Sequence, residues 1–319
     1  MKKLVSTLLL GLSLSGAAYA DYPEKPITAI VPFPPGGSTD AIARAIGPKV
    51  SQKLGQQLVV ENRPGATGAI GAGLVKRAPA DGYTILVASI GVYAVNPVLQ
   101  KSLPYDPSKD FDLLTVAVRA PNVLVAHPNF PANNVAELIA HLKKNPDKVT
   151  FASSGAGSSD HLTAALFWQQ SKTNGVHVPY KGGAPAITDL LGGHADVSFQ
   201  NINVVTNHIK AGKLKALAVT GDKRAAILPN VPTLNESGVP NVDVYSWQAV
   251  AAPKGLPANV KTKLHDAITG ALNDPELKAK LTEQGFEVVA NSSEEFSRFQ
   301  AQELARWRNV IETGKIEVD

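Results

Sequence analysis

Hydrophobic and polar positions alternate along the chain in a way that predicts strands and helices in turn. Short apolar runs rich in β-branched residues predict strands at 27–31, 58–60 and 83–88. Apolar residues at four-residue spacing predict one helix over 42–54, and residues 68–76 predict a shorter one. Pro48 lies inside the first helix and predicts a kink or an early end there. This order favours a parallel, doubly wound sheet.

The same alternation begins again near residue 149. Strands are expected at 149–152, 175–179, 195–199 and 214–220, and helices at 160–170, 184–191 and 204–210. We therefore expect an α/β fold with two lobes, each built on a doubly wound, mainly parallel sheet.

Two long apolar segments, 113–126 and 242–252, separate these sets, and the chain after them is helical. We interpret them as two strands that pass between the lobes, one outward and one back. Domain 1 would then be discontinuous (21–120 plus 247–319), and domain 2 would span 121–246. Ser292, followed three residues later by Glu295, predicts the start of the last helix. This arrangement is typical of two hinged lobes with a ligand cleft between them.

The N-terminus has the three parts of a secretory signal peptide. Lys2 and Lys3 are basic, residues 4–14 are apolar, and Ala18-Tyr19-Ala20 fits the small-x-small rule for cleavage after Ala20. The alternative is a membrane anchor, but the apolar stretch is well short of the ~20 residues that span a bilayer. We expect an exported, periplasmic protein.

The composition of the chain excludes several kinds of site and partner. The chain has 319 residues, a formal net charge of +4 and no cysteine. The absence of cysteine excludes disulfides, Fe–S clusters, Cys-ligated zinc and thiol catalysis, and it also excludes a lipid anchor on a cysteine at the cleavage point. The charge is mild, without a dense basic run, so we expect no nucleic-acid partner.

The first loop after a predicted strand is the most informative stretch. VPFPPGGSTD at 31–40 places two prolines and two glycines directly before a helix, where glycine leaves backbone N–H groups uncovered. A helix N-terminus carries unpaired N–H groups and a partial positive charge, which attract anions. An ordinary turn, with Ser38 or Thr39 capping the helix, is the alternative. The candidate ligand-binding residues are Phe33, Pro35, Gly36, Gly37, Ser38, Thr39 and Asp40.

A second glycine-containing loop joins a predicted strand to a predicted helix in the second lobe, at residues 151–161. It supplies glycines, serine hydroxyls and another helix N-terminus, and open α/β sheets bind ligands at the carboxyl ends of their strands. Two helix N-termini with partial positive charges that face each other would suit a small mono- or dicarboxylate. Neither a Walker A nor a G-x-G-x-x-G pattern is present, which disfavours phosphate or dinucleotide binding. The candidates here are Ser153, Ser154, Gly157, Ser158 and Ser159.

Several other residues allow both a functional and a purely structural interpretation. The Gly-rich loop at 61–68, with Ala66 and Thr67, fits a cleft contact and a tight connection about equally well, while Ser89 follows a strand that could end at the cleft.

A periplasmic serine hydrolase is the alternative function, suggested by the adjacent residues Ser158, Ser159, Asp160 and His161. Against it, the G-x-S-x-G elbow is missing, and triads are recognised by geometry rather than adjacency. The histidines show no paired metal-ligand spacing.

Several long motifs resemble one known family. They are VPFPPGGSTD at 31–40, VVENRPGATG at 59–68, LPYDPSKDF at 103–111, SSGAGSSDHL at 153–162 and VPYKGGAPAITDLLGGHADV at 178–197. The mature chain as a whole resembles the extracytoplasmic solute receptors of the tripartite tricarboxylate transporter type, the Bug family.

The resemblance implies a monomeric, two-lobed periplasmic binding protein with no catalysis and no cofactor. It implies a small carboxylate ligand, held by backbone amides and hydroxyls of the two loops, and partners that are the permease subunits of a tripartite transporter or a sensor domain. Asp196 and Asn201 match a further cleft region of the family. An ABC-transporter receptor, with the same cleft physics, remains an alternative. The ligand itself is not predicted.

Overall fold

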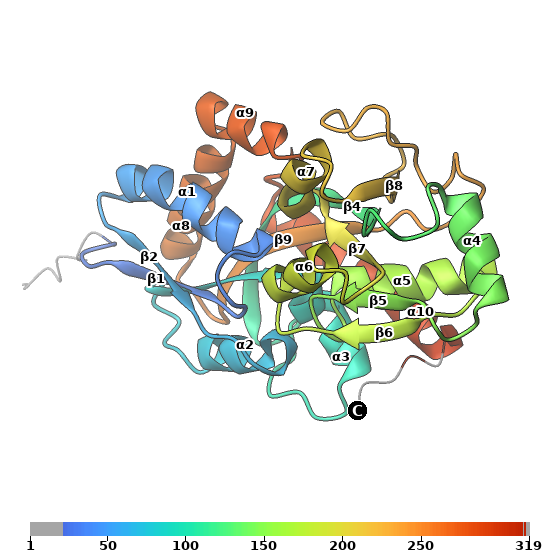
Figure 1. The fold of residues 1–319 in the computed structure, drawn as a ribbon. Coiled ribbons are helices and arrows are strands. Elements are labelled where there is room, and N and C mark those ends of the chain that lie inside the picture. Colours follow the sequence, from blue (N-terminus) through green and yellow to red (C-terminus); the bar gives the residue numbers. More distant parts are fainter. Residues whose placement is uncertain (1–21, 315, 317–319) are drawn as a thin grey trace, which may run out of the picture.

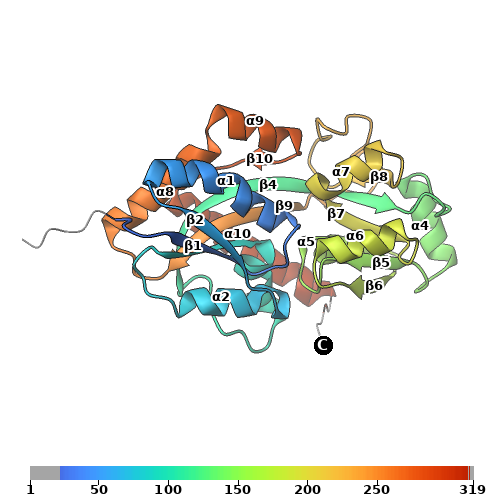
Figure 2. The ribbon, with the colours of Figure 1, turned by 60° about the vertical axis from the view of Figure 1, so that its left-hand side comes forward.

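The computed structural model describes residues 22–314 and 316. The signal peptide predicted at residues 1–20 lies outside the described residues. Figures 1 and 2 show two α/β halves side by side, with strands of both halves joined through long central strands. The strands follow the order β2-β1-β3-β9-β4-β7-β5-β6, and β8 and β10 each pair with β4. Within the described part of the chain, every helix is too short or too polar to cross a membrane.

The first half contains the predicted parallel unit. Strand β1 (Ile27–Val31) pairs in parallel with β2 (Leu58–Asn62) and β3 (Thr84–Ser89). Helix α1 (Ser38–Leu54) connects β1 to β2, and a 3-10 turn (Ala66–Gly68) with α2 (Ala69–Lys76) connects β2 to β3. Helix α1 does not end at Pro48; burial of Ile46, Val50 and Leu54 keeps it helical for two more turns. A π-helical turn (Gly91–Val95) and α3 (Asn96–Leu99), which the sequence did not predict, follow β3.

The second half is built in the same way. Strand β5 (Thr150–Ser153) pairs in parallel with β6 (Val176–Pro179) and β7 (Val197–Asn201). The connecting helices are α5 (Ser159–Ser171) and α6 (Gly183–Leu191), and α7 (Ile202–Lys210) leads to β8 (Lys215–Val219). Helix α4 (Val135–Lys144), capped by Asn134, precedes β5 and was not predicted.

Two long strands link the halves. Strand β4 (Phe111–Ala126) pairs with β9 (Tyr245–Pro253) as far as Pro121 and with β7 and β8 from Asn122 and Val123 onward, so one strand belongs to both sheets. Its pairs with β7, β8 and β9 are antiparallel, as is the pair of β9 with β3. The sheets are therefore mixed rather than mainly parallel, because both linking strands run against their neighbours.

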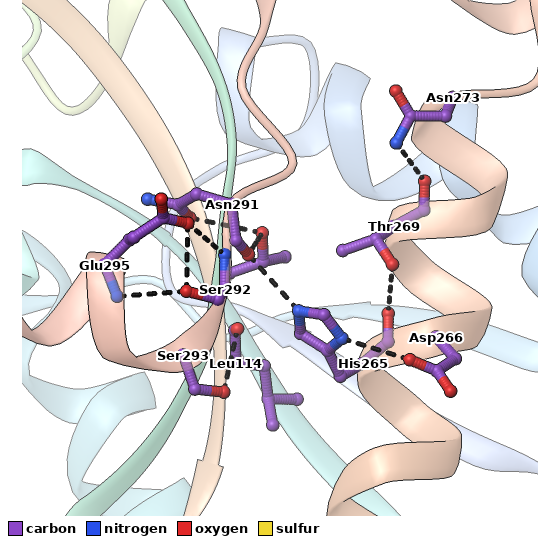
Figure 3. A network of polar contacts seen from close by, with 10 residues as sticks. Leu114, His265, Asp266, Thr269, Asn273, Asn291, Ser292, Ser293 and Glu295 are labelled. Atoms are coloured by element: carbon purple, nitrogen blue, oxygen red, sulfur yellow. Dashed lines mark hydrogen bonds and ion pairs between the residues drawn. The ribbon is translucent and has the colours of Figure 1, made fainter.

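The C-terminal helices return to the first half. They are α8 (Ala258–Leu272), α9 (Pro275–Glu283) and α10 (Ser293–Gly314), with the short strand β10 (Glu287–Val288) before α10. The start of α10 is the predicted capping box: Ser292 N–H donates to Glu295 Oε2 at 2.9 Å, and Glu295 N–H donates to Ser292 Oγ at 3.2 Å. Asn291 Oδ1 beside it accepts from Val116 N–H of β4 at 2.8 Å, which fixes the helix start to the sheet. Figure 3 shows a second bond to β4, in which Ser293 Oγ–H donates to the Leu114 carbonyl oxygen at 3.1 Å.

Apolar side chains pack on both faces of the sheet. One cluster joins α1 and α8 to the strands, and the other joins α2, α5 and α10 to the opposite face. Tyr93 and Trp247 stack in the second cluster with ring centroids 5.8 Å apart. These packed layers hold the carboxyl ends of β1 and β5 toward each other, which positions the loops described next.

Candidate binding cleft

A cavity of about 580 Å³ lies between the two halves. Its lining combines the loop after β1, the turn before α2, the end of β3, the loop before α5 and the loop before α6, with residues of β7 and β9 beside them. Its volume falls in the range of small-molecule sites, about 300–1,000 Å³. The predicted residues that line it are Phe33, Pro35, Gly37, Ser38, Thr39, Asp40, Ala66, Thr67, Ser89, Ser154, Gly157, Ser158, Ser159 and Asn201.

The N-terminus of α1 opens toward this cavity without a side-chain cap. Its N-cap residue is Gly37, in extended conformation, and no side chain of the residues that the structure describes caps the first turn. The expectation that Ser38 or Thr39 caps the helix is wrong: Ser38 lies inside it, and its hydroxyl donates to the other half, 2.7 Å from Asn203 Oδ1 and 2.8 Å from Asn201 Oδ1. The first-turn amides of a 17-residue helix are thus left for an anion.

The loop before α5 has a capped geometry. Ser158 is the N-cap and accepts from His161 N–H at 3.3 Å. Asp160 Oδ2, in the first turn, accepts from Ser154 N–H at 2.7 Å and from Ser154 Oγ–H at 2.6 Å. In the first half, Asp40 accepts from Gly36 N–H at 3.0 Å in a similar way. Each loop is therefore held in place by an aspartate of the helix that follows it.

A third helix N-terminus lines the cavity, and sequence reasoning missed it as a site. Helix α6 begins after Gly182, which has φ +117° and no side-chain cap. The loop from Pro179 to Pro185 lies along the cavity, and Lys181 is the one basic residue among the described residues of the lining. The signal was present, because Gly182-Gly183 before a helix repeats the pattern of Gly36-Gly37.

The two cavity aspartates differ in their environment. Burial acts to raise the pKa of Asp40, but hydrogen bonds from Arg44, Gly36 and Asn62 outweigh it and lower that pKa below its usual range. Burial raises the pKa of Asp160 despite its hydrogen bonds, and no ion pair involves it among the described residues. Each carboxylate accepts hydrogen bonds from its own loop.

The halves touch at the mouth of the cavity. A Cβ placed on Gly182 would lie 3.4 Å from Pro34 Cγ of the opposite loop, and one on Gly91 would lie 3.4 Å from the Gly157 carbonyl oxygen. Glycine at positions 91, 157 and 182 allows the loops of the two halves to approach this closely. The two halves are therefore in close contact beside the cavity.

Three predicted residues lie outside the lining. Gly36 supports the loop through its bond to Asp40, and Ser153 Oγ lies 2.6 Å from His177 Nε2. Asp196 precedes β7, whereas Asn201 ends that strand at the cavity. The Asp196 carboxylate accepts from Thr150 N–H and Oγ–H, both at 2.8 Å. The structure thus places Asp196 as a support of β5 rather than in the cleft. Arg63 also lies outside the lining and pairs with Glu61.

The histidine beside Ser158 and Ser159 does not face their hydroxyl groups. His161 Nδ1 accepts from Gly157 N–H at 3.0 Å, and its ring stacks on that of His177 at 3.8 Å between centroids. Burial lowers the pKa of His161 to about 3, with His177 adding to the shift, and burial lowers the pKa of His177 to about 4. The two histidines thus support the glycine loop through the bond from Gly157 N–H to His161. In the described structure, neither Ser158 nor Ser159 forms the hydroxyl–imidazole hydrogen bond that the hydrolase alternative needs.

Buried polar residues of β7 and β9 complete the lining. Gln200, Ser246 and Gln248 were not predicted, because a polar residue within an apolar strand gives no indication of the side to which it points. Gln200 Nε2 donates to Ser198 Oγ at 2.8 Å and to Asp160 Oδ2 at 3.3 Å. Ser89, which was predicted, pairs across the sheet with Gln248.

Comparison with known proteins agrees with this geometry. Residues 42–316 match the sequence profile of the tripartite tricarboxylate transporter family receptor. The chain belongs to this family. The match begins within α1 and continues through both halves to the end of α10.

Solved structures of relatives share the fold. The periplasmic binding protein BugD is 37% identical with a TM-score of 0.88, covering 93% of this chain and 99% of its own. Rpa4515 of R. palustris, solved with adipate, is 36% identical with a TM-score of 0.90, covering 93% and 99%. MatC from Rhodopseudomonas palustris, solved with bound malate, is 30% identical with a TM-score of 0.87, covering 91% and 100%. The chain therefore has the two-lobed fold of periplasmic solute receptors.

Proposed function

We propose that this receptor captures a small organic carboxylate in the cleft. The observation that carries the proposal is the pair of uncapped helix N-termini, of α1 after Gly37 and of α6 after Gly182, on one cavity of about 580 Å³. Amides at a helix N-terminus and the helix dipole stabilise an anion without a neighbouring Arg or Lys. The two relatives solved with adipate and with malate support the same class of ligand.

Opening and closing of the lobes would let the ligand enter and leave. We place the hinge at residues 118–123 and 244–249, with domain 1 comprising 21–120 plus 247–319 and domain 2 comprising 121–246. The pairing of β4 supports this placement, because it changes from β9 to β7 and β8 at Pro121 and Asn122. A hinge needs only a few residues at element boundaries to absorb the motion.

Delivery of the ligand is the remaining part of the function. We infer that a monomer exported to the periplasm, with cleavage after Ala20, passes the carboxylate to the permease subunits of a tripartite tricarboxylate transporter or to a sensor domain. Family membership supports this role.

The proposal is tested first on the protein as purified. Native mass spectrometry is expected to show a retained small acid, and a thermal-shift panel of mono- and dicarboxylates is expected to raise the melting temperature for at least one of them. A ligand at 100 times its Kd adds about 2.7 kcal/mol to the free energy of unfolding. A panel without any stabilising carboxylate would contradict the proposal, and labelling of Ser158 or Ser159 by a serine-reactive probe would favour a hydrolase instead.

A further inference from the structure

Gln248, a residue of the cavity lining, has an unsatisfied polar atom. Its side chain on β9 is fully buried, the residue lines the cavity, and Oε1 has no hydrogen-bond partner among the described residues. Buried polar atoms in proteins are nearly always paired, so an exception requires an explanation. The orientation of this amide is the first question, because exchanging its oxygen and nitrogen would change what it offers to a ligand.

A chain of hydrogen bonds, beginning at Thr163, is consistent with the orientation in which the oxygen is the unpaired group. This threonine, inside α5, donates its one hydroxyl proton to the Ser159 carbonyl oxygen at 2.6 Å. It can therefore only accept from Asn122, whose Nδ2 lies 3.1 Å away. Asn122 Oδ1 then faces Asn201 and accepts from its Nδ2. The amide of Asn201 is thereby oriented with its oxygen on the other side.

The second part of the chain leads to Gln248. Asn201 Oδ1 accepts from Ser246 Oγ–H at 3.4 Å. With the Ser246 proton directed to Asn201, its oxygen accepts from Gln248 Nε2 at 3.1 Å. The Gln248 amide nitrogen is thus directed to Ser246, and the oxygen is left as the unpaired group. The hydroxyl and amide directions along this path agree with one another from Thr163 to Gln248.

We infer that Gln248 Oε1 selects ligands that carry a hydrogen-bond donor in addition to their carboxylate. The preferred ligand class is then hydroxy or amino acids over the corresponding unsubstituted acids. A donor on the ligand would pair the buried oxygen, while a methylene group in its place would leave it unpaired. Sites built to bind a ligand OH or NH group discriminate strongly against analogues that lack it. This inference rests on the proposed function, because it assumes a carboxylate in the cleft.

Calorimetry with matched pairs of acids tests the inference. The pairs are malate and aspartate against succinate, glutamate against glutarate, and 4-hydroxybenzoate against benzoate. For the pair that contains the tightest ligand, the wild-type protein is expected to bind the donor-bearing acid at least about 10-fold more tightly, which corresponds to about 1.4 kcal/mol. Equal affinities within every pair would overturn the inference and leave the proposed function intact.

Two variants separate the role of Gln248 from a general effect on the cleft. Gln248→Met removes the oxygen at similar side-chain length, and it is expected to weaken the donor-bearing acid about 10-fold relative to its partner acid, so that the preference is lost. Gln300→Met is the matched control, because Gln300 is also buried but donates to Tyr93 O outside the cavity. A preference that persists in Gln248→Met would overturn the inference. If Gln248→Met fails to fold, the titrations of the wild-type protein with the matched acids still test the inference. A wild-type protein that binds none of the acids would overturn the proposed function together with this inference.

Discussion

The hydroxyl of Ser38 lies 2.8 Å from Oδ1 of Asn201, although 163 residues separate them in the sequence. The bond joins the first turn of α1 to the end of β7, and therefore one half of the molecule to the other. A serine at the start of a helix usually caps it, but here the capping position belongs to Gly37. The hydroxyl is thus used between the halves, and the helix amides remain open to the cavity.

Removal of this contact is expected to destabilise the protein. Ser38→Ala leaves Asn201 with one donor fewer, and a typical hydrogen bond of this kind contributes about 1 kcal/mol. Urea denaturation is expected to show a loss of about that size in the free energy of unfolding. Ser297→Ala is the control, because the Ser297 hydroxyl donates only to the Ser293 carbonyl oxygen within α10. Equal losses in the two variants would contradict an interlobe role for Ser38.

Gly37→Val tests the role of the bare amides at α1. Gly37 has φ −85°, which valine adopts without strain, and a Cβ there meets no atom within 4 Å. The variant is therefore expected to fold normally while its side chain covers the first-turn N–H groups, and carboxylate affinity is expected to fall at least about 10-fold, or 1.4 kcal/mol. Gly47→Ala in the same helix is the control and should bind as the wild type does. Unchanged affinity of Gly37→Val in calorimetry would remove the role assigned to this loop.

Gly182→Ala tests closure of the cleft. The added Cβ would lie 3.4 Å from Pro34 Cγ, and φ +117° is unfavourable for alanine. Gly212→Ala places alanine at φ +68° without any nearby atom, so it is the control for a positive φ alone. It is expected to lose about 1 kcal/mol of stability, whereas Gly182→Ala is expected to lose more, because φ +117° with ψ 170° is a region that essentially only glycine occupies. Only Gly182→Ala is expected to bind carboxylates more weakly. Parallel titrations and melting curves separate the two effects.

The buried histidine pair predicts a pH dependence of stability. Burial lowers the pKa of His161 to about 3 and that of His177 to about 4, from a usual value of 6.5. Between pH 6.5 and 5 the unfolded chain binds protons that the folded pair does not, so the free energy of unfolding is expected to fall as the pH is lowered. Each histidine contributes at most about 1.4 kcal/mol per pH unit.

Denaturation of wild type and His177→Gln between pH 7.5 and 5 tests this dependence. The variant lacks one of the two groups, so its stability is expected to decrease less steeply over the window. His208→Gln, which changes a histidine outside the pair, should keep the wild-type slope. A slope that is the same in all three proteins would show that the pair is not the cause.

Much of the fold could be predicted because the hydrophobic pattern is regular. The parallel units of both halves, the two linking strands and the Ser292–Glu295 helix start all follow from local periodicity and capping residues. The mixed character of the sheet could not be predicted in this way, because strand direction depends on where β4 and β9 return. Ala120-Pro121-Asn122 resembles a turn in sequence, but the strand continues through it as its partners change.

The candidate site was predictable where glycines mark a strand-to-helix loop. Gly37 and Gly157 were found by this signal, and Gly182 carries the same signal but was missed. Asp196 was assigned to the cleft by resemblance, whereas it lies at the opposite end of β7 from Asn201. Gln248 could not be found from the sequence, because its significance depends on hydrogen bonds that run through three other elements, α5, β4 and β7.

The central claim is that helix N-termini hold a carboxylate in the cleft. The most direct measurement is calorimetric titration of the wild-type protein with the acid that native mass spectrometry identifies and, in parallel, with its uncharged primary amide. Main-chain amides and helix dipoles favour the anion, so the acid is expected to bind at least about 100-fold more tightly, or 2.7 kcal/mol. Equal affinity for the acid and its amide would contradict the account.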